Sequence, residues 1–240
     1  MISKNEIKEI RSLGQKKFRQ ERGLFVVEGE KLVAEALQSD FEIVARYRIE
    51  DIGEEAMARI SQLTHPSPDL AVLRIPRNDA EFPLQTDADE LVLALDGIHD
   101  PGNLGTILRI ADWFGIRTIL TSEDTVELYN PKVVQATMGA IFRVKVHYGN
   151  LAAALKTQTV PVYGTFLEGD GIYDLPLTRG GILVMGSEAD GISPQVAAAV
   201  TQKLFIPPFP PDQRTGESLN VAVATAIACN EFRRRVSHFS

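Results

Sequence analysis

The sequence predicts an α/β fold: a small α/β domain followed by a larger domain built on a parallel sheet. In the second half, from Leu91 onward, short apolar runs alternate with helical patterns, which is typical of a parallel sheet covered by helices. A polar, acidic stretch without periodicity separates this half from the first. The 240 residues, 44% of them hydrophobic, are enough to bury a core in each half. We therefore predict domains at 1–78 and 91–240, joined by a linker at 79–90.

The first domain should contain helices and three strands. Ile7, Ile10 and Leu13 recur at helical spacing and predict helix over most of 3–22, with a break at Gly14. The segment that follows predicts a strand, a turn and a helix. The remaining elements are strands, and the predicted ranges in this domain are 23–37 for the strand–turn–helix unit, then 42–49 and 69–76.

The second domain should contain six strands and five helices. The strands are expected at 91–95, 118–120, 144–146, 162–166, 182–185 and 204–206. The helices are expected at 104–115, 131–139, 150–156, 193–200 and 220–236. A turn is expected at Gly169–Gly171. Ligands of such sheets bind beyond the carboxyl ends of the strands, so the loops there are the first place to look for chemistry.

Composition excludes several classes of protein. The longest apolar runs are far too short to cross a bilayer, and the charged N-terminus has no signal-peptide core, so we expect a cytoplasmic protein without a membrane partner. Cys229 is the only cysteine and is expected to be a buried apolar residue, which rules out a disulfide within the chain. The four histidines have no metal-ligand spacing. We predict no metal site.

The charge is unevenly distributed. The net charge is −7, but residues 1–25 hold seven basic and three acidic side chains, a local charge of +4 that leaves −11 for the rest. Because phosphate contacts depend on local potential, a basic leading segment can serve an acidic chain. A solvated helix face explains the same residues, and composition alone slightly favours that explanation.

The common nucleotide-binding fingerprints are missing: the sequence has neither the phosphate-loop pattern nor a G-x-G-x-x-G between a strand and a helix. Three other loops stand out. In the first, 95–115, Asn103 is a good N-cap for the following helix, and Arg109 lies opposite that helix's apolar stripe. An arginine at this position can be interpreted as a solvated helix residue or as a residue of a functional site.

The second loop, 182–193, carries Glu188 between Gly186 and Gly191, and Ser193 with Pro194 can begin the next helix. Glycines there let backbone approach a ligand closely, although Glu188 also fits a solvent-facing acid. The third loop lies in 204–227, where a proline-rich excursion precedes the last helix. Capping of that helix alone would explain Ser218 or Asn220.

Together the three loops resemble the motifs of the SpoU/TrmH family of RNA ribose methyltransferases. The resemblance rests on DPGNLGTILR, GSEADGIS, and IP followed by ESLNVAVATAI, with YNPKVVQATMGAIFRV and VYGTFLEGD between the first two. It covers essentially all of 91–236. KKFRQERGLFVVEGEKLVAEAL also resembles the substrate-binding domain often found before the catalytic domain.

The resemblance implies a SPOUT fold with a deep C-terminal trefoil knot, a homodimer with the active site at the subunit interface, and S-adenosylmethionine as cofactor. It implies an RNA substrate, either tRNA or rRNA, methylated at a ribose 2′-hydroxyl. Carried over, the cofactor contacts fall on Thr165, Gly186, Ile206, Ser218 and Leu219. The catalytic or site-shaping positions fall on Asn103, Arg109, Glu188 and Asn220.

The chain departs from the family pattern at a few positions. Ala189 stands where glycine is common, and Gln135 and Thr137 stand where arginine and serine are frequent. These changes bear on RNA contacts rather than on methyl transfer. The segment between Ile206 and Glu217 is also longer than usual and rich in proline, which bears on the wall of the cofactor site.

The resemblance leaves the role of Arg109 open. A guanidinium rarely loses its proton, so we interpret Arg109 first as an anchor for phosphate and the developing oxyanion, with the role of literal base as the alternative. Two rival functions remain. One is an RNA-binding relative that has lost turnover, and the other is a metabolic α/β enzyme acting on a small molecule.

Overall fold

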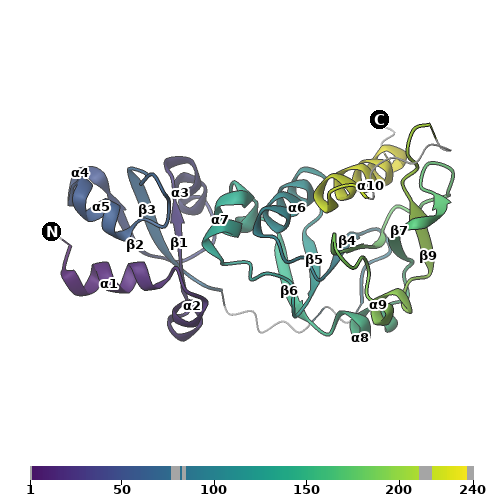
Figure 1. The fold of residues 1–240 in the computed structure, drawn as a ribbon, viewed down its shortest axis with the longest axis horizontal. Coiled ribbons are helices and arrows are strands. Elements are labelled where there is room, and N and C mark those ends of the chain that lie inside the picture. Colours follow the sequence, from purple (N-terminus) through teal and green to yellow (C-terminus); the bar gives the residue numbers. More distant parts are fainter. Residues whose placement is uncertain (1, 77–81, 83–84, 211–217, 237–240) are drawn as a thin grey trace. The chain divides into compact units, whose positions relative to one another are not determined.

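The computed structural model describes residues 2–76, 82, 85–210 and 218–236 (Figure 1). The chain forms two compact units. The first comprises Met1–Arg77 and Glu127–Arg143, and the second comprises Asn78–Val126 and Val144–Ser240. The predicted linker falls partly on 77–81 and 83–84, which lie outside the described residues.

The first unit is built on a three-stranded antiparallel sheet in the order β1-β3-β2. The strands are β1 (Leu24–Glu28), β2 (Ile43–Arg48) and β3 (Asp69–Arg74), as the sequence predicts. The unit's helices are α1 (Lys4–Ser12), α2 (Lys16–Arg22), α3 (Glu30–Leu37), α4 (Ile49–Ile52), α5 (Glu54–Ile60), α7 (Pro131–Thr137) and the short 3-10 helix η1 (Ala140–Phe142).

Helices cover both faces of this sheet. Ile7 and Ile10 of α1 and Met57 and Ile60 of α5 pack with Val72 in one apolar cluster. The helices α3 and α7 both contact β1. The break between α1 and α2 at Gly14 is confirmed, whereas α4 and α5 were not predicted, because their short segments carry too little periodicity to separate helix from loop.

The segment Glu127–Arg143 belongs to the first unit although it lies far along the chain. The buried Arg19 guanidinium forms a paired hydrogen bond with the Glu127 carboxylate, with Nη2–Oε2 at 2.5 Å and Nε–Oε1 at 3.2 Å. The ring of Phe25 lies 4.7 Å from that of Tyr129. These contacts group the segment with residues 1–77 rather than with the rest of 91–240. The predicted domain boundaries stay a prediction.

The second unit contains a parallel six-stranded sheet in the order β6-β5-β4-β8-β7-β9. The six strands confirm the prediction: β4 (Leu91–Asp96), β5 (Thr118–Ser122), β6 (Lys145–Gly149), β7 (Val162–Gly171), β8 (Gly181–Gly186) and β9 (Gln202–Phe205). The expected turn at Gly169–Gly171 is wrong. These residues extend β7, and Asp170 pairs with Leu204 of β9 after a register shift.

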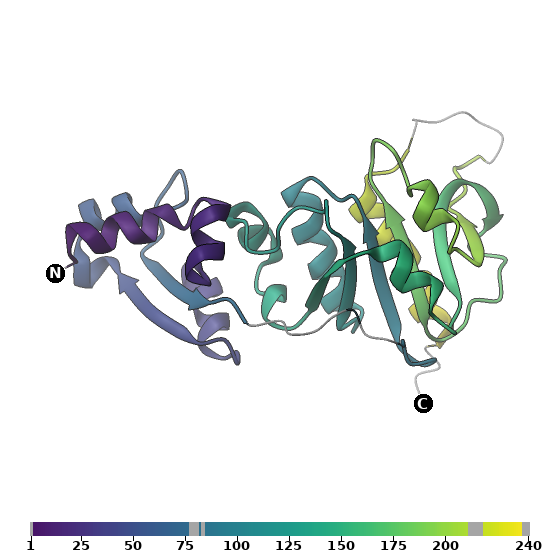
Figure 2. The ribbon, with the colours of Figure 1, turned by 90° about the horizontal axis from the view of Figure 1, so that it is seen from below.

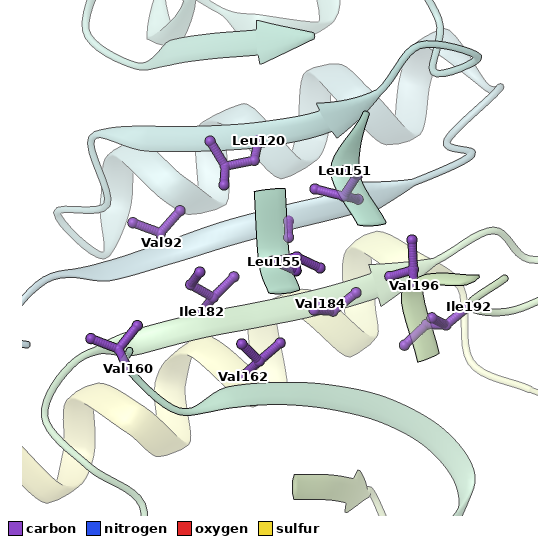
Figure 3. Close-up of a cluster of buried hydrophobic side chains, with 11 residues drawn as sticks. Val92, Leu120, Leu151, Leu155, Val160, Val162, Ile182, Val184, Ile192 and Val196 are labelled. Carbon is purple, nitrogen blue, oxygen red and sulfur yellow. The ribbon is translucent and has the colours of Figure 1, made fainter. Parts of the chain in front are cut away.

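Helices cover both faces of the larger sheet (Figure 2). They are α6 (Pro101–Trp113), α8 (Leu151–Lys156), α9 (Pro194–Ala197) and α10 (Val221–Val236). On one face, Leu151 and Leu155 of α8 and Val196 of α9 pack on strand residues such as Val184 (Figure 3). On the other face, α6 and α10 pack side by side. The ring centroids of Phe232 in α10 and Tyr163 in β7 lie 5.1 Å apart.

Candidate active site

The candidate site lies at the carboxyl edge of the larger sheet. The three loops singled out in the sequence follow β4, β8 and β9, and β4 is the direct neighbour of β8. Parallel strands bring their carboxyl ends to one edge, so loops that are far apart in the sequence meet there. This edge collects most of the predicted site residues.

The first loop begins helix α6, but not at the residue that the sequence predicts. Asp100 is the N-cap, its Oδ1 accepts the Asn103 amide at 2.9 Å, and Pro101 takes the first helical position. Asn103 as N-cap is therefore wrong. The Asp-Pro pair is a strong helix-start signal that sequence reasoning missed. With Asp100 as the cap, the Asn103 side chain is available for a contact elsewhere.

That contact is with Asn220, which joins all three loops. Its Nδ2 donates to Asn103 Oδ1 at 2.9 Å and to Glu188 Oε1 at 2.6 Å. Its Oδ1 accepts the backbone amides of Ala222 at 3.0 Å and Val223 at 3.3 Å. Asn220, one of the two residues predicted as a cap, thus caps α10. Its side-chain amide also links the other two loops.

Glu188 is exposed but not a free loop acid. Besides the Asn220 contact, its Oε1 lies 3.3 Å from the Val221 amide, so its carboxylate sits at the N-terminus of the long helix α10. The positive end of the helix dipole stabilises a negative charge there. The geometry fixes the acid in position through Oε1, and among the described residues its Oε2 accepts no hydrogen bond.

The glycines of the second loop are required by the loop's own backbone conformation. Ser187 and Gly191 exchange backbone hydrogen bonds at 3.1 and 3.0 Å, which closes a tight turn around Glu188. A Cβ on Gly186 would lie 2.1 Å from the Gly191 carbonyl carbon, so no other residue fits. Ser193 stands at the N-cap position of α9 without a side-chain bond. Its amide instead donates to the buried Asp96 carboxylate at 2.7 Å.

The predicted cofactor contacts follow three adjacent strands. Thr165 lies in β7, Gly186 ends β8, and Ile206 follows β9, in the sheet order β8-β7-β9. The Thr165 hydroxyl donates to the Val184 carbonyl at 3.2 Å, which ties β7 to β8. Ser218 and Leu219 lie exposed just before α10, while 211–217 of the proline-rich segment lie outside the described residues.

Arg109 does not join this polar cluster. It is exposed on α6, on the side away from the buried residues Leu104, Ile107 and Leu108. Its side chain makes no hydrogen bond or ion pair with any residue that the structure describes. The predicted orientation is confirmed, and the structure by itself brings together Asn103, Glu188 and Asn220 but not Arg109.

One acidic residue that the sequence analysis did not single out, Asp124, also lies at this edge. Asp124, after β5, lies 3.5 Å from His99 Nε2, and hydrogen bonding from Ser122 lowers the pKa of Asp124, with His99 contributing less. No signal in a single sequence marks such a pair. Among the described residues, no cluster of histidine, cysteine and acidic side chains has the makings of a metal site, and no helix is long and apolar enough to cross a membrane.

Two of the departures from the family pattern, Gln135 and Thr137, form hydrogen bonds within the first unit. The Gln135 amide donates to the Glu28 carbonyl at 2.6 Å, which holds α7 on β1 within the first unit. Thr137 is fully buried and donates to the Val134 carbonyl at 2.7 Å. Cys229 is also buried, as predicted, and burial raises the pKa of its thiol to about 12. The side chains of Thr137 and Cys229 are therefore closed to a ligand.

The chain is similar to known proteins along its whole length. A 23S rRNA (guanosine(2553)-2′-O)-methyltransferase, RlmP of Bacillus subtilis, is 32% identical over 96% of this chain and 97% of its own. A solved structure of a TrmH-family protein from Porphyromonas gingivalis has 41% identity and a TM-score of 0.87, covering 98% of this chain and 99% of that one. An AdoMet-bound rRNA methyltransferase from Sinorhizobium meliloti has 28% identity and a TM-score of 0.84, covering 99% and 98%.

Family models match both parts of the chain. Residues 4–65 match the MRM3-like substrate binding domain. Residues 90–230 match the SpoU rRNA Methylase family and include all the positions assigned to the site. Since this second match spans more than half of the sequence and carries the hydrogen-bonded cluster of Asn103, Glu188 and Asn220, the chain belongs to the SpoU family of RNA methylases.

Proposed function

We propose that this protein transfers a methyl group from S-adenosylmethionine to a ribose 2′-hydroxyl of tRNA or rRNA. The observation that carries the proposal is the Asn220 side chain, which ties together the three family loops at the carboxyl edge of the sheet. In the reaction a bond forms between the hydroxyl oxygen and the methyl carbon, the carbon–sulfur bond breaks, and the hydroxyl proton leaves. Bound S-adenosylmethionine supplies the activated methyl group.

The residues at the edge fit that cofactor. Gly186 ends β8, Ile206 follows β9, and Thr165 lies in β7 just beyond its last pair with β8, so backbone from three adjacent strands is available to contact one ligand. Leu219, with 49% of its surface exposed, offers an apolar contact beside Ser218. A mixture of backbone groups and a few apolar side chains suits a nucleoside with a flexible sulfonium chain. We assign Thr165, Gly186, Ile206, Ser218 and Leu219 to cofactor binding.

We assign Asn103, Arg109, Glu188 and Asn220 to the reaction. A hydroxyl is a weak nucleophile near neutral pH, so the site must orient it and assist the loss of its proton. Arg109 keeps its charge and acts as an anchor for RNA phosphate and for the developing oxyanion. Asn220 and Asn103 hold the loop that carries Glu188 in place.

We propose that the active site is completed in a homodimer, through the face formed by α6 and α10. Trp113 on α6 is 85% exposed and lies one helical turn beyond Arg109, and Val223 on α10 is 49% exposed. An exposed tryptophan on a pair of packed helices is a common anchor of protein interfaces. A partner subunit on this face would enclose Arg109. Light scattering at micromolar concentration should give the mass of a dimer.

Three further assignments complete the proposal. We assign the SPOUT trefoil knot to the second unit, in keeping with the bonds that Glu188, after β8, accepts from Asn220 and Val221 at the start of α10. Residues 1–78 bind the RNA substrate and 91–240 carry out the transfer. We also propose that the protein acts in the cytoplasm.

The test is transfer of a labelled methyl group from S-adenosylmethionine to RNA, with 2′-O-methyl positions mapped in RNA from cells with and without the gene. Arg109→Ala should lower the single-turnover rate at saturating RNA by on the order of 10²-fold or more, because about 3 kcal/mol of oxyanion stabilisation is lost. Cofactor binding, measured by calorimetry, should stay near the original value.

Two variants sharpen this test. Arg109→Lys should restore little activity, because lysine lacks the planar two-pronged contact. Arg179→Ala removes another largely exposed arginine of the second unit and should leave the rate unchanged. An Arg109→Ala protein that reacts at nearly the original rate would return Arg109 to a solvated helix residue. Cofactor binding without any transfer to RNA would support the non-catalytic rival, and transfer to small metabolites would support the metabolic one.

A further inference from the structure

The first helix of the protein presents three cations in one row. Lys4, Lys8 and Arg11 occupy positions i, i+4 and i+7 of α1, and all three are exposed. At about 100° and 1.5 Å per residue, the three side chains fall within about 60° of one another, on a stripe about 10 Å long. The buried residues Ile7 and Ile10 lie beyond one edge of the stripe, about 70° and 130° around the helix from its middle.

The acidic side chains near this stripe are engaged elsewhere. Glu6 lies about 160° around the helix from the stripe. It accepts the Tyr47 hydroxyl at 2.6 Å, and that bond lowers the pKa of its carboxyl. Glu9 faces Arg22 at 3.7 Å, and Glu21 faces Lys17 at 3.8 Å. The negative charges of this segment therefore do not neutralise the stripe.

The stripe cations themselves have no internal role. Lys4, Lys8 and Arg11 form no ion pair or side-chain hydrogen bond with any residue in the described part of the chain. By contrast, Arg19 in the same basic segment is buried and bound to Glu127. The basic segment thus holds a structural arginine, cations paired with surface acids, and the row of three side chains without a partner among the described residues.

We propose that Lys4, Lys8 and Arg11 form a docking stripe for the phosphate backbone of the RNA substrate. The inference rests on the proposed function and adds to it the residues of the first unit that contact RNA. Consecutive phosphates present a row of negative charges, and a straight row of flexible cations on one helix face matches them without reading the bases. The stripe holds the RNA while base recognition takes place elsewhere.

The experiment compares two variants of the full-length protein that lose the same charge. In the stripe variant, Lys4, Lys8 and Arg11 are all changed to Gln, which keeps good helix propensity. In the control, Lys31, Arg59 and Lys132, exposed cations on α3, α5 and α7 of the same unit, are changed to Gln. The probe is unmodified 23S rRNA made by transcription in vitro, with binding measured over a range of salt concentrations.

The stripe variant should bind this RNA at least about tenfold more weakly at low salt, and its slope of log K against log salt should fall by about 2 to 3, since each phosphate contact contributes about 0.7 to 0.9. The KM for RNA should rise while kcat at saturating RNA stays unchanged. The control should change affinity and slope much less.

Equal losses in the two variants would overturn the proposal, because they would reflect net charge rather than a site. Full RNA affinity in the stripe variant would also overturn it, and binding of the original protein to vesicles of anionic phospholipid, lost in that variant, would assign the stripe to a membrane instead. Absence of methyl transfer to RNA by the original protein is a separate outcome, which counts against the proposed function and not against the stripe.

Discussion

Two clusters of basic residues, one at each end of the chain, have opposite roles in the structure. The three consecutive arginines Arg233–Arg235 of α10 are the densest basic run in the sequence, yet all three are bound within the second unit. The cations of α1 are spread over eight residues and none of them is bound among the described residues. Charge density along a sequence therefore does not indicate which cations are available to a ligand.

The α10 arginines fasten the last helix to the rest of the unit. Arg233 donates to the Phe114 carbonyl at the end of α6 at 2.8 Å, and burial lowers its pKa. Arg234 and Arg235 both bond the buried carboxylate of Glu231. Arg235 also donates to the carbonyls of Ile172, Tyr173 and Leu175, beyond β7. These contacts hold α10 in place behind the site.

The largest effect on stability should come from Arg235→Ala. This change removes the bonds to three carbonyls and leaves the buried Glu231 with one arginine, which should lower the free energy of unfolding by about 2 to 4 kcal/mol. Thermal unfolding measures the loss, and RNA affinity of the folded protein should stay the same. A fall in RNA affinity at unchanged stability would place the α10 arginines with the α1 stripe and break the comparison.

A smaller, pH-dependent effect should come from Glu231. Hydrogen bonds from Arg234 first, and also from Arg235, hold the pKa of Glu231 below its ordinary value of 4.5. A lowered folded-state pKa gives stability that is present above pH 4.5 and is lost as the pH falls through the folded value. Glu231→Gln should therefore cost about 1 to 2 kcal/mol at neutral pH and progressively less in acid. Urea unfolding of both proteins across this pH range checks the sign, and a difference that grows in acid would refute it.

The smallest effect should come from the α1 stripe. Because the Arg11 side chain makes no hydrogen bond or ion pair with any described residue, Arg11→Ala should change the free energy of unfolding by no more than about 0.5 kcal/mol. The same thermal measurement as for Arg235→Ala gives a direct comparison. A loss as large as that of the α10 variant would show that the stripe supports the fold, and would remove the distinction between the two clusters.

The site was predictable in its loops but not in its contacts. The strands β4, β8 and β9 end within one residue of the predicted positions, because buried apolar runs bounded by glycine and proline are local signals. The bond between Asn103 and Asn220 joins residues 117 positions apart, and no local pattern encodes it. The local pattern therefore predicts a helix cap at Asn103, the role that Asp100 fills in the structure.

By itself the sequence determined the order of most helices and strands, the parallel sheet and the family, since each of these is encoded in periodicity or in short motifs. The tertiary structure decided that Glu127–Arg143 belongs with the first unit, through the Arg19–Glu127 pair and the contact between the rings of Phe25 and Tyr129. It also decided which cations are free. Both depend on partners distant in the chain, because an ion pair or a ring contact forms only where folding brings its two members together.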